Sequence, residues 1–138
     1  MKRFLLRFAV VSAFVGSSFL GLAADSPNFA GEYADKKFMK GQGVLQLSLE
    51  QTGNKVSIFF SGVRNDGQGA APEINATGNV TSKGVVEFKF QDDLKNSGNG
   101  TITKAGEDVV LSIKPTRVAD SRAMPFYGQN MRLKRVKK

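Results

Sequence analysis

Hydrophobic and polar residues alternate with a period of two in several runs between residue 43 and the C-terminus. The clearest runs are centred on Leu47, Ile58, Phe88, Leu111 and Leu133. In each run one face is apolar and the other is mostly polar, which is typical of an antiparallel strand that packs one face on a core. Long stretches with helical spacing are absent after residue 24. The pattern therefore predicts an all-β protein.

Short segments rich in Gly and Asn separate these runs. Gly53, Gly84 and Gly106 each lie in such a segment, and glycine tolerates the positive φ of tight hairpin turns. Loops this short favour antiparallel pairing between consecutive strands. The predicted strands are residues 29–35, 43–51, 55–64, 73–80, 84–92, 99–104, 108–115 and 126–134.

Eight consecutive short strands within about 115 residues predict an antiparallel up-and-down sheet. A sheet of this length tends to curl, and closing it into an eight-stranded β-barrel removes its exposed edges. The interior of such a barrel is either nearly filled by side chains or holds one small ligand. A two-sheet β-sandwich has the same periodicity and is the alternative.

The first 23 residues have the pattern of a cleaved secretory signal peptide. Lys2, Arg3 and Arg7 form a positive start, and an apolar run with small residues follows as far as Leu22. An uncleaved membrane anchor is the alternative, but the run is shorter than the ~20 residues that span a bilayer. Cysteine is absent, which excludes a lipid anchor on an N-terminal cysteine. Its absence also fits a bacterial periplasm better than a disulfide-rich eukaryotic secreted fold.

Cleavage after Ala23 or Ala24 would leave one β-barrel domain, residues 24–134, and a basic C-terminal tail, residues 135–138. The predicted location is periplasmic or secreted, with a soluble chain after cleavage. The signal peptide holds three of the 20 basic residues and none of the 12 acidic ones, so the rest of the chain carries a net charge of +5. The excess positive charge of this part of the chain lies at its C-terminus. The chain therefore lacks the basic stripe of a nucleic-acid-binding face. We expect either a solvated tail or a weak contact with an anionic surface.

The chain contains no His, Cys or Trp. It therefore lacks an imidazole base, a thiol nucleophile and the usual zinc ligands. No Gly-x-Ser-x-Gly motif is present, and no two carboxylates are spaced for acid–base catalysis. The loop from Gln91 to Gly100 collects Asp and Asn side chains, but their spacing differs from that of a calcium loop and is typical of turns. The composition predicts a protein that is not an enzyme and has no cofactor or metal.

Gly31 and Tyr33 form a Gly-x-aromatic motif in the first predicted strand, and Arg132 lies in the last one. With its signal, this early motif and eight alternating strands, the chain resembles the calycin superfamily of lipocalin-like and avidin-like barrels. The resemblance covers the layout of the whole chain after the signal. It implies that Tyr33, in place of the family's Trp, closes one barrel end and that Arg132 packs across its ring.

The candidate ligand-binding residues are Phe60, Phe88, Phe90, Tyr33, Arg117 and Arg122. The three phenylalanines fall on inward faces, so they are predicted either to pack the core or to line an apolar ligand cavity. The two arginines belong to the irregular stretch of residues 115–125. This stretch is predicted to be either a connector or a lid over one barrel end, with an arginine that meets an anionic group.

Phe59 falls on the polar face of its run, between Ser57 and Ser61. Alternation therefore predicts that its ring points outward, where it either forms part of a partner surface or is covered by a neighbouring loop. Arg64 and Asp66 follow at the start of a long loop and complete the candidate partner surface.

Two functions are consistent with these patterns. The first is an exported, non-catalytic binding barrel that carries a small apolar or amphipathic ligand. The alternative is a periplasmic protein-binding module, such as an enzyme inhibitor or an immunity-type protein, that acts through its loops. A hollow barrel would favour the first function and a filled barrel the second.

Overall fold

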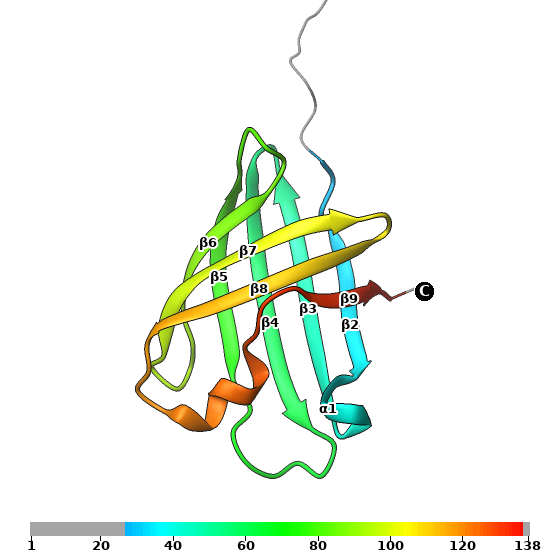
Figure 1. The fold of residues 1–138 in the computed structure, drawn as a ribbon. Helices are drawn as coiled ribbons and strands as arrows, with labels where there is room; N and C mark the ends of the chain where they lie inside the picture. The colour runs from blue at the N-terminus through cyan, green and yellow to red at the C-terminus, as the bar shows by residue number, and fades with distance from the viewer. Residues whose placement is uncertain (1–26, 137–138) are drawn as a thin grey trace, which may run out of the picture.

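The chain folds into a closed barrel of eight antiparallel strands, shown by a computed structural model that describes residues 27–136 (Figure 1). Each strand pairs with the next along the chain, and the last pairs back with the first. The predicted up-and-down barrel is confirmed, and the two-sheet alternative is wrong. The predicted signal peptide lies outside the described residues. The strands are β2 (Gly31–Lys37), β3 (Gly43–Thr52), β4 (Lys55–Arg64), β5 (Glu73–Val80), β6 (Val86–Gln91), β7 (Ser97–Ala105), β8 (Asp108–Arg117) and β9 (Met131–Arg135).

Two short helical segments lie at the lower end of the barrel in Figure 1. The first is α1 (Phe38–Gly41), between β2 and β3, and the second is the 3₁₀ helix η1 (Ser121–Phe126), between β8 and β9. The eighth strand was predicted to begin at residue 126, but β9 begins only at Met131. The Asp120 side chain accepts a hydrogen bond from the backbone N–H of Arg122 at 3.0 Å, which caps η1 and keeps this stretch out of the sheet. No helix in residues 27–136 is long and apolar enough to cross a membrane.

The period of two places one face of every strand inside the barrel. The β3–β4 hairpin shows this most fully, since its ten paired positions run from Gly43 opposite Arg64 to Thr52 opposite Lys55. Gly53 turns the chain between these strands with a φ of +60°. The inward residues of all eight strands form one hydrophobic core. A register slip of one residue would turn such an apolar face outward, so core burial fixes the pairing.

Inward glycines make room for phenylalanine rings. Gly100 on β7 lies opposite Phe88 on β6, and a Cβ on Gly100 would overlap the Phe88 ring. A Cβ on Gly62 would lie 2.5 Å from Cδ1 of Phe126. Large rings thus fill the volume that these two glycines leave free.

Replacing Gly100 with alanine is expected to lower the free energy of unfolding by about 1–3 kcal/mol, because the added methyl group must displace the Phe88 ring in a packed core. Urea denaturation would measure the loss. Gly128→Ala is the matched control, since a Cβ there would meet only Met131, at an ordinary distance of 3.5 Å. Equal stability of the two variants would contradict the tight packing described here.

The upper end of the barrel is closed around Tyr33. The Tyr33 hydroxyl donates a 2.8 Å hydrogen bond to the backbone carbonyl of Phe29, and the side-chain oxygen of Gln51 accepts the backbone N–H of Phe29 at 2.8 Å. The guanidinium of Arg135 lies 5.8 Å from the centre of the Tyr33 ring. Tyr33 is therefore buried at this end of the barrel.

The arginine on that ring is Arg135, and the expectation for Arg132 is wrong. Arg135 is registered directly opposite Tyr33 across β2 and β9. Arg132 lies an odd number of residues away, so its side chain points to the other face of the strand. There it forms a salt bridge of 3.1 Å with Asp108.

Candidate functional site

The predicted aromatic ligand-binding residues lie inside the barrel and contact one another. Phe60, Phe88, Phe90 and Tyr33 are only 1–5% exposed. The Phe88 and Phe90 ring centres are 6.5 Å apart, and Phe90 meets the edge of Tyr127 at 5.6 Å. A cavity able to hold a ligand would leave accessible area on the rings that line it. These rings have almost none, so they pack the core.

The lower end of the barrel is closed by side chains of the chain itself. Phe126, the last residue of η1, is buried against Gly62 and stacks on Phe38 of α1 with ring centres 5.8 Å apart. Ala123 of η1 is also buried. The irregular stretch that was predicted to be a connector or a lid thus contributes to closing this end, together with Phe126.

Arg117 and Arg122 are not brought together with the inward phenylalanines. Both are exposed, Arg117 at the end of β8 and Arg122 on η1. Arg122 forms a 2.6 Å salt bridge with Asp120. Side-chain hydrogen bonds from Arg122 lower the pKa of Asp120 to about 2. This exposed pair closes a local turn and faces away from the barrel interior.

A buried polar cluster, which the sequence reasoning missed, joins the β6–β7 turn to the segment after η1. Its centre is Asp92, whose Oδ1 accepts the backbone N–H groups of Leu94 and Asn96, each at 2.8 Å. Its Oδ2 accepts the Asn96 side-chain amide at 2.9 Å and the Tyr127 hydroxyl at 2.6 Å. Asp92 and Asn96 are both buried. Four donors thus satisfy the carboxylate, as a buried charge requires.

Asn96 extends this cluster to the chain that follows β8. Its Oδ1 accepts the backbone N–H groups of Ala119 and Asp120, each at 2.8 Å. Burial raises the pKa of Tyr127 most, and its hydrogen bond to Asp92 raises it further. The turn chemistry predicted for residues 91–100 is therefore present, but its link to Tyr127 spans 35 positions that no local pattern signals. The cluster holds the lower end of the barrel in place.

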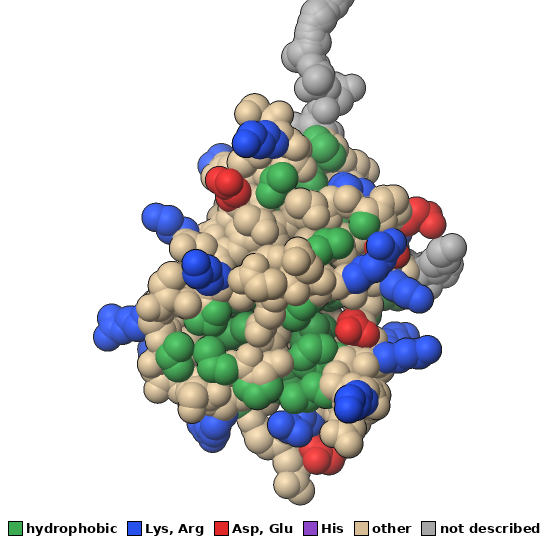
Figure 2. All heavy atoms as spheres, in the orientation of Figure 1, with side chains coloured by type: hydrophobic (Ala, Val, Ile, Leu, Met, Phe, Trp, Pro, Cys, Tyr) green, Lys and Arg blue, Asp and Glu red, His purple; other side chains and the backbone are tan. Residues whose placement is uncertain are grey.

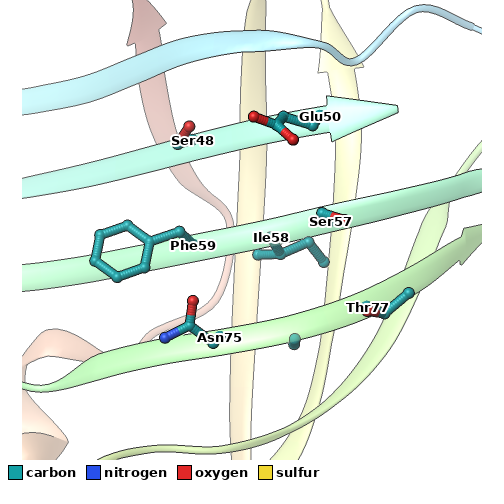
Figure 3. Close-up of a pocket in the computed structure, with 8 residues that line it drawn as sticks. Ser48, Glu50, Ser57, Ile58, Phe59, Asn75 and Thr77 are labelled. Atoms are coloured by element: carbon teal, nitrogen blue, oxygen red, sulfur yellow. The ribbon is translucent and has the colours of Figure 1, made fainter. Parts of the chain in front are cut away.

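A groove on the outer wall crosses β3, β4 and β5, and we name it the Phe59 groove. It has a volume of about 520 Å³ and is lined by Ser48, Glu50, Ser57, Ile58, Phe59, Asn75, Ala76 and Thr77. Figure 3 shows Phe59 projecting from β4 beside Asn75 of β5. The groove is lined mainly by uncharged polar side chains around one aromatic ring, and Glu50 is its only charged residue.

The three residues of the predicted partner surface do not form one patch. Phe59 is half-buried in the groove. Arg64 lies five residues farther along β4, about 16 Å away at the usual rise per residue. Asp66 lies in the exposed loop after β4, where its carboxylate accepts the backbone N–H of Gln68 at 2.9 Å. Val63, four residues beyond Phe59 on the same face of β4 and 39% exposed, also lies outside the groove lining.

Other surface features lie away from this groove. Figure 2 shows hydrophobic side chains gathered in the lower half of one face, below β8. The segments beside η1 contribute exposed or half-buried apolar residues, including Val118 and Met131. A further groove of about 380 Å³ lies between β2 and β9 and is lined mostly by basic residues.

Residues 27–136 contain no group of three or more acidic side chains placed to hold a metal ion. The one buried carboxylate in the loop that was considered for calcium is Asp92, and protein donors already occupy both of its oxygens. Comparison with protein-family models, curated proteins and solved structures found no match to this chain.

Proposed function

We propose that this protein is an exported, non-catalytic binding barrel that engages another protein through the Phe59 groove. The observation that carries the proposal is the contrast between a filled interior and an aromatic ring held on the outer wall. The inward rings are at most 5% exposed, whereas Phe59 lines an open groove of about 520 Å³.

The composition of the groove supports a protein partner. The centres of protein interfaces are enriched in aromatic residues and depleted of charged ones. Phe59 lies between Ser48 on β3 and Asn75 on β5, its registered neighbours. Val63 and its cross-strand partner Val44 lie farther along the same outer face, beyond the polar pair Gln46 and Ser61. A rigid sheet presents these side chains with little loss of conformational freedom on binding.

Carriage of a small apolar ligand inside the barrel has less support. An internal ligand would have to displace rings that are packed against one another and against Gly62 or Gly100. The Phe59 groove is itself large enough for a small molecule, but it lies open on a convex wall. Small-molecule sites usually bury most of the ligand surface.

Phe59→Ser is expected to weaken binding of the partner about 30-fold or more, which is the effect of removing a central aromatic anchor of about 2 kcal/mol. The test is native mass spectrometry of protein purified from its own compartment. Val118→Ser is the matched control, since it removes a 52% exposed apolar side chain outside the groove. We expect a co-purifying polypeptide with the unmodified chain and with the control, and its loss with Phe59→Ser.

Two results would contradict this proposal. An adduct of small-molecule size that Phe59→Ser retains would indicate a carrier. A polypeptide that binds equally to the unmodified chain and to Phe59→Ser would place the interface elsewhere. Thermal unfolding of each variant would show that the fold is retained.

A further inference from the structure

The seam where the barrel closes is only partly paired. β2 and β9 are registered at two positions, Tyr33 opposite Arg135 and Ala34 opposite Lys134. Continuing the same register would place Lys36 opposite Arg132, but the ladder has ended there. The groove of about 380 Å³ lies over this part of the wall. We name it the seam groove, and it is lined by Ala34, Asp35, Lys36, Lys37, Arg132, Lys134, Arg135 and Val136.

Positive charge dominates the seam groove. Five of its eight lining residues are basic and one is acidic. Figure 2 shows Lys and Arg side chains on both sides of the molecule, including the right-hand side where β2 and β9 lie. Among the described residues, Lys36 and Lys134 form no salt bridge, and both are exposed. Both ammonium groups are exposed to an anion from outside, and the charge of Lys134 also acts on Asp108.

Asp108 holds one of these cations, Arg132, and also binds the backbone of Arg135. Its carboxylate accepts Arg132 at 3.1 Å through Oδ2 and the backbone N–H of Arg135 at 3.1 Å through Oδ1. This acid offsets one positive charge and positions β9 beside the groove. With Asp35 and Asp108 counted against the five basic residues, the region keeps an excess of three positive charges.

The seam groove also contains apolar surface. Val136 is 38% exposed, and the buried Ala34 is the other apolar residue of the lining. The methylene stems of Lys36 and Lys134 add to this surface, because long basic side chains expose apolar stems below their charge. A cationic rim with an apolar floor matches the region of a lipid where a phosphate meets the glycerol and acyl groups. The volume is within the usual range for a small-molecule site.

We propose that the seam groove binds the phosphate-bearing head group of an anionic phospholipid, so that this wall of the barrel docks on a negatively charged membrane surface. Basic residues beside such a surface each strengthen attachment several-fold. Lys137 and Lys138 follow Val136 in the sequence and add to the positive charge of the chain. The inference is independent of the Phe59 groove, which lies on other strands.

Vesicle co-sedimentation tests this proposal with the full chain after its predicted signal. We expect binding to vesicles of phosphatidylcholine mixed with phosphatidylglycerol and none to phosphatidylcholine alone. The double variant Lys36→Glu, Lys134→Glu should lose at least about 20-fold in partitioning, and Val136→Ser should lose about threefold. The matched control is Lys83→Glu, Lys89→Glu. It makes the same change of charge at exposed sites in the β5–β6 turn and on β6, on the opposite wall of the barrel.

Three outcomes would overturn the proposal. Equal losses in the two double variants would show only diffuse attraction between a basic protein and an anionic surface. Equal binding to both vesicle types would exclude recognition of the anionic head group. Saturation of the seam groove by inorganic phosphate alone, as tightly as by vesicles, would assign it to a free anion. If the glutamate variant does not fold, Lys36→Gln, Lys134→Gln serves in its place, with an expected loss of at least fivefold.

Discussion

Asp92→Ala is expected to lower the free energy of unfolding by about 3–5 kcal/mol, the largest loss we predict for a single substitution. The substitution removes the acceptor of four hydrogen bonds. It leaves the buried Asn96 amide and the half-buried Tyr127 hydroxyl without their partner. The β6–β7 turn and the chain after η1 would then lose the contact that joins them.

Urea denaturation of Asp92→Ala measures this loss, and the adjacent residue provides the control. Asp93 is exposed, and its carboxylate accepts one hydrogen bond, from the backbone N–H of Glu73 at 2.9 Å. Asp93→Ala should therefore cost about 1 kcal/mol or less. Tyr127→Phe removes only one donor and should fall between the two. If Asp92→Ala were no less stable than Asp93→Ala, the buried cluster would not support the fold as described.

Neither tyrosine of the folded protein is expected to ionise near pH 10, where an exposed phenol does. Burial raises the pKa of Tyr33, although the charge of Arg135 opposes the shift. Burial and the hydrogen bond to Asp92 raise the pKa of Tyr127 by a larger amount. Since both folded pKa values exceed the unfolded ones, the unfolded chain binds fewer protons at high pH. The contribution of the two neutral tyrosines to the free energy of unfolding is therefore fully present below pH 10. It is lost as the pH rises above that value.

Phenolate absorption followed against pH tests this expectation. The chain has two tyrosines and no tryptophan, so the signal belongs to Tyr33 and Tyr127 alone. We expect little absorption at pH 10 and a steep rise at higher pH, together with loss of the β-sheet circular dichroism signal. Tyr127→Phe should lose stability less steeply above pH 10. Phenolate formation with a midpoint near 10 in the folded protein would contradict the burial of both rings.

Much of the barrel could be predicted because the patterns that specify a strand or a turn lie within a few consecutive residues. The alternation around Leu47 and Ile58 identified two strands, and Gly53 between them identified the turn. Their antiparallel pairing then follows from the short connection. The same reasoning failed at the last strand, where Asp120 caps a 3₁₀ helix and β9 starts later than expected. Residues 121–126 can either form a capped 3₁₀ helix or extend the strand. The free-energy difference between these two conformations is not visible in the alternation of apolar and polar residues.

The details of the sites depended on pairings between distant segments. Arg135 rather than Arg132 lies on Tyr33 because the register between β2 and β9 decides which side chain faces that ring. The burial of Asp92 depends on Tyr127, which comes from the far end of the chain. The Phe59 groove needs three strands side by side, although alternation already predicted that this ring points outward.

The sequence by itself determined the order of the strands and, except for the start of the last one, where they lie, since the period of two and the turn residues act over a few positions. Only the tertiary structure decided between the closed barrel and the two-sheet alternative, and between a filled and a hollow interior. Those outcomes depend on how rings from different strands meet glycines such as Gly62 and Gly100 across the interior. The packing of side chains that are distant in the sequence is set by the register of the whole sheet, which no single segment contains.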